Sequence, residues 1–136
     1  MVYKGGNYKI IRKDLLYSEL SFKINGALFD VFKQLGGGHH ERYYQRAVSI
    51  SLQKRGLEFI EQHHVPLLFD NQKVGKYFLD FLVEDKIILE LKRGRYIPIN
   101  VLNQVKGYLS AMDLKLAIVG CFAHDTVVIK RISNLY

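Results

Sequence analysis

Three charged residues interrupt two apolar segments in residues 77–92, YFLDFLVEDKIILELK. Asp80 stands in the first segment, and Glu90 and Lys92 stand in the second. Because strand side chains alternate between faces, Glu90 and Lys92 share a face, and Leu79 and Phe81 share the face opposite Asp80. Both segments are apolar on both sides, so we expect the acids to be partly desolvated. An unpaired buried carboxylate is costly, and some group must compensate each one.

The two acids face each other only if the connection between their strands has an odd number of residues, for example residues 84–86. A two-residue loop would place them on opposite faces. Facing carboxylates repel, and a hard cation such as Mg²⁺ binds through one or two carboxylates plus a substrate phosphate. Lys92 would stand at the same site, where its amine could hold an attacking water or a phosphate. The alternative is a structural ion pair between Lys92 and one acid.

The elements that position these residues follow from hydrophobic periodicity. Helical spacing predicts helices over residues 18–35, 40–55 and 99–113. Apolar runs predict strands over residues 57–69, 77–83, 87–92, 114–123 and 126–132, with a turn at 70–75. Pro66 marks an edge, a bulge or a break in the first strand. The order helix, helix, three strands, helix, two strands predicts an α/β fold with one mixed sheet.

Length and composition favour one domain. The chain has 136 residues, of which 49% are hydrophobic, and we expect an N-terminal arm over residues 1–17 and a single domain over 18–136. No apolar run reaches the ~18 residues of a membrane span, and no secretory signal is evident, so we expect a soluble, cytoplasmic protein. The lone Cys121 and the Cys/His spacing do not suggest a zinc site. The net charge of +7 suits nucleic acid as a partner, and equally a merely soluble surface.

The arrangement of these motifs is more specific than each motif alone. Aspartate on one strand and Glu-x-Lys on the next, with a helix before and after, resembles the PD-(D/E)XK nuclease superfamily. Within it, the chain resembles the GxxExxY family, whose motif is found in residues 38–44, GHHERYY. The likeness continues through KRGLEF, NQVKGYL and IKRIS and covers roughly residues 18–133. It implies a restriction-endonuclease-like αβββαβ core, a mixed central sheet flanked by helices, and an extra N-terminal helix.

The resemblance also implies roles for single residues. The implied catalytic residues are Asp80, Glu90 and Lys92, and the implied metal ligands are Glu41, Asp80, Glu90 and the backbone carbonyl of Leu91. Supporting positions are Gln104, Tyr108 and Tyr44, although Tyr43 and Tyr44 are expected to pack rather than to stack on bases. The chain departs from the family pattern at Leu79, where proline is common, and at Cys121, where relatives often carry Asn.

Basic residues provide candidate phosphate contacts, with a solvated rim as the alternative; they are Lys92, Arg93, Arg95, Lys54 and Arg55. The implied function is a nuclease that hydrolyses DNA phosphodiester bonds with Mg²⁺ or Mn²⁺, and within that class a junction-resolving nuclease acting as a homodimer. The rival is an inactive nuclease-fold module that binds nucleic acid or a protein. All motif residues are present, which favours an enzyme. The sequence does not choose between DNA and RNA.

Overall fold

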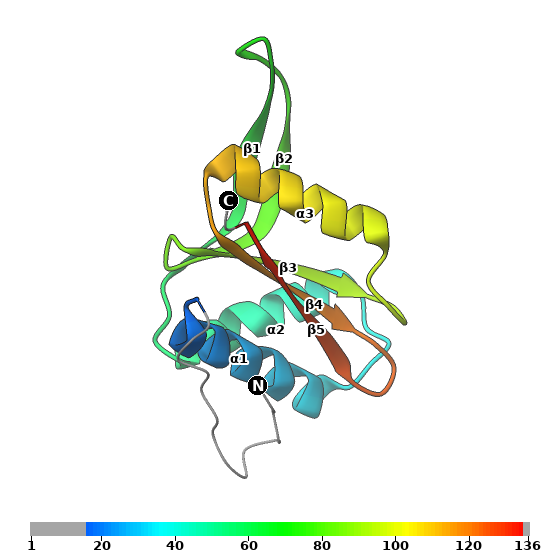
Figure 1. Ribbon diagram of the computed structural model, residues 1–136. Helices are drawn as coiled ribbons and strands as arrows, with labels where there is room; N and C mark the ends of the chain where they lie inside the picture. The colour runs from blue at the N-terminus through cyan, green and yellow to red at the C-terminus, as the bar shows by residue number, and fades with distance from the viewer. Residues whose placement is uncertain (1–15, 135–136) are drawn as a thin grey trace.

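Two helical layers enclose a five-stranded sheet in the computed structural model, which describes residues 16–134 (Figure 1). The elements are α1 (Ser18–Leu35), α2 (Glu41–Lys54), β1 (Phe59–Phe69), β2 (Gln72–Val83), β3 (Ile87–Arg93), α3 (Ile99–Met112), β4 (Leu116–Phe122) and β5 (Val127–Ser133). The strands follow one another in the order β1-β2-β3-β4-β5, and only β3 and β4 run parallel. The predicted α/β fold, with its mixed sheet and additional N-terminal helix, is confirmed. The predicted arm, residues 1–17, lies almost wholly outside the described residues.

Helices α1 and α2 cover one face of the sheet, and α3 covers the other (Figure 1). Strand β3 shows the alternation clearly. Ile87, Leu89 and Leu91 pack in the core beneath α1 and α2, whereas Ile88 packs in the core beneath α3. By the same alternation Glu90 and Lys92 lie on the α3 side. Within residues 16–134, no helix combines the length and the apolar character that crossing a membrane requires.

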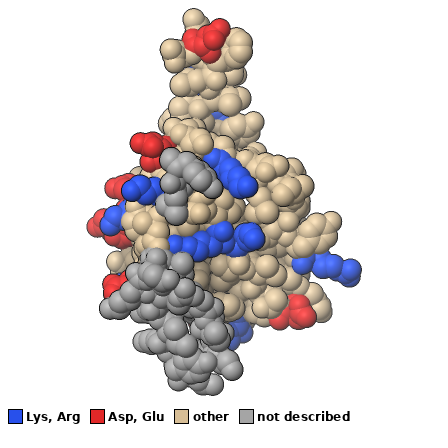
Figure 2. All heavy atoms as spheres, in the orientation of Figure 1, with Lys and Arg blue, Asp and Glu red and all other residues tan. Residues whose placement is uncertain are grey.

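Strands β1 and β2 continue past the helical layers as a two-stranded ribbon (Figure 1). The predicted turn at 70–75 is too long, because β2 already begins at Gln72. Asp70 and Asn71 alone make the turn, with φ of 49° and 60°. These residue types tolerate the left-handed backbone that a two-residue hairpin requires. On the side seen in Figure 2, the ribbon is largely uncharged apart from acidic atoms at its tip.

The sheet divides where β2 leaves β3. These strands pair at only three positions, ending at Phe81–Leu89, after which β2 continues beside β1 and β3 continues beside β4. The connection between them is residues 84–86, an odd number, as the facing of the acids requires. Continuing the register by one step sets Asp80 opposite Glu90. The strands therefore diverge at the two acidic residues.

Candidate active site

Where β2 and β3 diverge, the side chains of Asp80 and Glu90 accept hydrogen bonds from the backbone of the opposite strand. The backbone N–H of Asp80 donates to Glu90 Oε1 at 2.9 Å, and the N–H of Leu91 donates to Asp80 Oδ2 at 2.7 Å. Each carboxylate thus accepts a hydrogen bond from the opposite strand. These bonds hold the two acids side by side across β2 and β3, as the odd-numbered loop predicts.

Both carboxylic acids are easier to protonate than usual. Burial first, and then the charge of Asp80, raise the pKa of Glu90 to about 8. Burial likewise raises the pKa of Asp80, although the N–H of Leu91 and the charge of Lys92 act in the opposite direction. The ion pairs among the described side chains belong to Asp30, and neither Asp80 nor Glu90 forms one. The two acids are therefore desolvated without a paired cation.

Lys92 lies near the acids without pairing with them. It is half-buried, follows Glu90 on the same face of β3, and lowers the pKa of both acids through its charge. In the register of β3 and β4, Lys92 lies opposite Cys121, which is fully buried. The Cys121 thiol donates to the carbonyls of Gly94 and Tyr96. The departure from the family pattern at this position thus has a structural role, because the thiol holds the segment that follows β3.

Glu41 stands apart from the close pair. It is the first residue of α2 and is exposed, a position where the helix dipole favours an anion. Its charge nevertheless raises the pKa of both Asp80 and Glu90, so it lies within their electrostatic range. Among residues 16–134, no three His, Cys, Asp or Glu side chains gather closely enough to hold a metal ion together. The structure brings two of the three expected acidic ligands together and leaves Glu41 at the rim.

A break in the β1–β2 ladder orients Asp80. Gln62 lies opposite Asp80 but does not pair with it, and its φ of 52° is left-handed. Leu79 packs beneath α3 whereas Phe81 packs beneath α1 and α2, so the expected alternation, which put both on one face, is wrong at this point. The Gln62 side chain hydrogen-bonds Asp80 and favours its charged form. Ladder irregularities occur next to active sites, where they redirect a side chain.

Gln45 is a second contact that sequence reasoning missed. Its amide donates from α2 to the carbonyl of Asp80 at 3.2 Å and to Glu61 Oε1 at 3.4 Å. Ser49, one turn later on α2, donates to the other oxygen of Glu61 at 3.3 Å. These bonds join α2 to the backbone that carries Asp80. No periodicity marks Gln45, because its partner is 35 residues away.

The supporting residues divide into two groups. Burial first, and then the charge of Glu90, raise the pKa of Tyr108 to about 12, so Tyr108 lies within electrostatic range of Glu90. Gln104 is exposed one turn earlier on α3. Tyr44 belongs to the core instead. Its hydroxyl donates to the carbonyl of Gly36 at 2.6 Å, and its ring stacks on Phe122 at 4.0 Å between centroids. The expectation that Tyr44 packs, rather than stacks on bases, agrees with these contacts.

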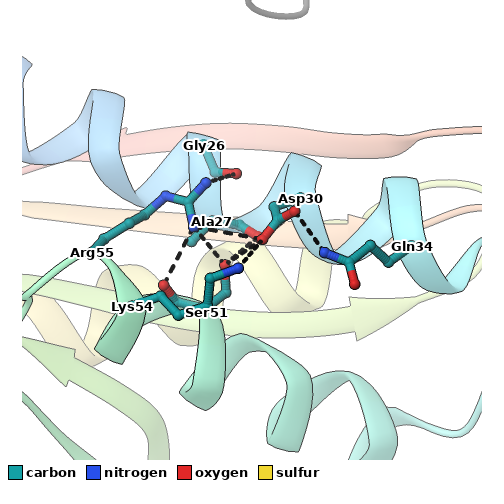
Figure 3. Close-up of polar contacts among 7 residues, drawn as sticks. All are labelled: Gly26, Ala27, Asp30, Gln34, Ser51, Lys54 and Arg55. Atoms are coloured by element: carbon teal, nitrogen blue, oxygen red, sulfur yellow. Dashed lines mark hydrogen bonds and ion pairs between the residues drawn. The ribbon is translucent and has the colours of Figure 1, made fainter.

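The candidate phosphate contacts are also separated. Lys54 and Arg55 lie at the end of α2 opposite Glu41, where both form ion pairs with Asp30, at 3.7 and 3.6 Å (Figure 3). Arg55 additionally donates to Ser51 Oγ at 2.8 Å and to the carbonyl of Gly26 at 3.1 Å. Their charges are thus committed to joining α1 and α2. Arg93 and Arg95 are exposed at the end of β3, next to Lys92.

Comparison with known proteins agrees with this arrangement. No curated protein sequence matches the chain. The crystal structure of SSO0001 is similar over 85% of this chain and 77% of that one, but at 12% sequence identity and a TM-score of 0.47 the likeness carries no argument. The family model of the PD-(D/E)XK nuclease superfamily matches residues 18–132, which include every element of the fold but the last residue of β5. The chain therefore belongs to the PD-(D/E)XK nuclease superfamily.

Proposed function

We propose that this chain is a nuclease that hydrolyses phosphodiester bonds of DNA with the help of a divalent cation. One observation carries the proposal: Asp80 and Glu90 are held side by side, desolvated, without an ion pair to a described cation. Such an arrangement opposes folding, and a purely structural site would gain by replacing it. Titratable groups perturbed in this way are typical of functional sites.

The donor set suits a hard cation such as Mg²⁺ or Mn²⁺. We assign Asp80, Glu90 and the backbone carbonyl of Leu91 as its ligands, since such ions take oxygen donors and bind through few carboxylates. Glu41 would add negative charge from the rim. When bound, the cation supplies polarisation of the scissile phosphate and a water of lowered pKa.

Lys92 has the position that an assisting cation needs. It shares the α3 side with Glu90 and forms no ion pair within residues 16–134, so we assign its amine to an attacking water or to charge developing on phosphate. The backbone bonds to the two carboxylates and the contacts of Gln62 and Gln45 keep the acids in place when substrate binds. Preorganised groups of this kind stabilise the transition state without further rearrangement.

Finer assignments belong to the same proposal. We assign the chain to the GxxExxY family within the superfamily, on the motif in residues 38–44, and we assign it a cytoplasmic location. A small, basic domain suits a branched substrate, so we assign a junction-resolving nuclease acting as a homodimer as the specific form. Linear, circular, branched and RNA substrates with Mg²⁺ or Mn²⁺ test these assignments together.

Cleavage by the wild-type chain is expected on at least one DNA substrate, and Asp80→Asn should lower the rate by about 100-fold or more. Asp113→Asn is the matched control, because Asp113 is exposed at the C-cap of α3. It should cleave like the wild type. Equal rates for Asp80→Asn and wild type would contradict the proposal.

The competing candidate is an inactive module that keeps the fold and binds nucleic acid or a protein. The position of Glu41 outside the close pair favours it, because the third expected acidic ligand is not gathered with the others. A wild-type chain that binds Mn²⁺ but cleaves none of the substrates would favour this reading over the nuclease.

A further inference from the structure

A pocket of about 530 Å³ opens at the carboxyl ends of the parallel strands β3 and β4. Its size falls in the range of sites for small ligands. Basic side chains line it from residues 93–95 and from the turn after β4, and apolar side chains line it as well. Its lining includes Arg93, Arg95, Ala123, His124, Asp125 and Val128.

Glycines in two loops allow the walls of this pocket to approach one another. A Cβ on Gly37 would lie 2.6 Å from the carbonyl oxygen of Ala123 and 2.7 Å from that of His124, so only glycine lets the α1–α2 loop touch the turn after β4. Gly94 has a φ of 133°, and its N–H donates to the carbonyl of Phe122 at 3.0 Å. The pocket is therefore framed by fixed backbone.

The charges around the pocket favour an anion. Arg93 and Arg95 are exposed, and neither forms an ion pair or a side-chain hydrogen bond within residues 16–134, unlike Arg55. His124 adds a third basic side chain, and Asp125 is the one acid in the lining. Guanidinium groups match the geometry of phosphate oxygens, and two of them flank one glycine.

Apolar atoms in the same pocket favour more than a free phosphate. Val128 is 38% exposed, and the largely buried Ala123 also lines the pocket. A sugar or a base would cover this surface while its phosphate met the arginines. The chemistry of the lining thus matches a nucleotide, with one charged end and one largely apolar end.

The pocket lies close to the two acids along the chain. Arg93 follows Glu90 by three residues, which is roughly 10 Å along a strand. Glu90 and Lys92 lie on the α3 side, whereas alternation turns Arg93 toward the α1 and α2 side. We propose that this pocket binds one nucleotide of the substrate strand, with its phosphate on Arg93 and Arg95, a few nucleotides from the phosphate at Asp80 and Glu90. The inference rests on the proposed function, since it locates part of its substrate.

The test measures binding in a chain that does not cleave. A fluorescent single-stranded DNA of about 12 nucleotides is titrated with Asp80→Asn protein at several salt concentrations, and anisotropy reports the Kd. Adding Arg93→Gln and Arg95→Gln should weaken binding about tenfold and reduce the salt slope by about 0.7, since both arginines contact one phosphate and each single-strand phosphate contact contributes about 0.7.

The matched control removes two charges from the opposite ends of the same strands. Lys86 and Lys115 are exposed and immediately precede β3 and β4, so Lys86→Gln with Lys115→Gln should change Kd less than about twofold. Equal weakening by both pairs would show a general charge effect and overturn the pocket. Circular dichroism melting confirms that each double variant is folded.

A second variant tests the apolar end. Val128→Glu places an anion in the pocket and should weaken binding, whereas Val74→Glu on the ribbon, where Val74 is 62% exposed, should not. Wild-type cleavage is measured separately. If the chain cleaves but binding ignores Arg93, Arg95 and Val128, the pocket is wrong and the nuclease stands. If binding depends on these residues but nothing is cleaved, the nuclease is wrong and the pocket stands.

Discussion

Two acidic sites in this molecule are built on opposite principles. Asp30 on α1 accepts hydrogen bonds from Gln34 at 2.9 Å and Ser51 at 3.3 Å and forms ion pairs with Lys54 and Arg55 (Figure 3). The hydrogen bond from Gln34, with smaller contributions from the two cations, lowers its pKa. At the divergence of β2 and β3, burial raises the pKa of both acids, and no described cation pairs with them.

The two sites differ in whether the chain itself stabilises the charge of the acid. The Asp30 cluster stabilises its own charge and joins α1 to α2, so it needs nothing further from outside the chain. Within residues 16–134, Asp80 and Glu90 accept hydrogen bonds from backbone N–H groups and from Gln62, and their charged forms remain unfavourable. Under the proposed function this cost has a reason, because active sites trade stability for activity.

The largest expected effect is the loss of cleavage when Lys92 is removed, in contrast to the removal of Lys54 beside Asp30. Lys92→Ala should lower cleavage by about 100-fold or more, yet cost less than about 1 kcal/mol of unfolding free energy, because no ion pair is lost. Lys54→Ala should leave cleavage unchanged. Single-turnover rates and urea unfolding measure the two quantities. A loss of roughly 3–5 kcal/mol in Lys92→Ala would instead assign it as the partner of a buried acid.

Divalent cation should affect only the site at the strand divergence. Mn²⁺ at about 100 times its Kd should raise the unfolding free energy by about 2.7 kcal/mol, since it binds the folded chain. Asp80→Asn should abolish most of this gain, while Asp30→Asn should retain it. Thermal melting with and without millimolar Mn²⁺ measures the response. An unchanged wild-type melting curve would argue strongly against a metal site.

Removing each aspartate should change stability in opposite directions. Asp30→Ala leaves the partly buried Arg55 without its ion-pair partner and should cost about 1–3 kcal/mol of unfolding free energy. Asp80→Asn removes an unfavourable charge, so the metal-free protein should be as stable as the wild type or slightly more stable. Urea denaturation in the presence of a chelator compares them. A strongly destabilised Asp80→Asn variant would show that its charge is compensated after all.

The pH dependence of the metal-free protein compares the same two sites. The pKa of Glu90 is raised from 4.5 to about 8, so its contribution to stability is complete below 4.5 and is lost as the pH rises through about 8. Asp30 has a lowered pKa, and its contribution is lost as the pH falls through that value. Melting from pH 4 to about 9 should show a decline that Glu90→Gln reduces. The same decline in Glu90→Gln would assign it to other groups.

Short-range patterns determined much of the fold and the centre of the site. Periodicity placed every helix and most strand boundaries within two residues, because it reports which face of each element is buried. The odd number of residues between Val83 and Ile87 was enough to predict that Asp80 and Glu90 face each other, since the register of the paired positions extends by one step to the two acids. Motif spacing along one hairpin therefore encodes the carboxylate pair.

Contacts between distant segments decided the rest. Lys54 with Arg55 and Arg93 with Arg95 are both pairs of basic residues in the sequence. Only the packing of α2 against α1 brings Asp30 to the first pair. The left-handed Gln62 and the reach of Gln45 to Asp80 likewise depend on neighbours far along the chain. Residue types and local spacing specify what a side chain can do. Which partner neutralises it, and which charge remains available, depends on tertiary packing, because desolvation and pairing act through space rather than along the sequence.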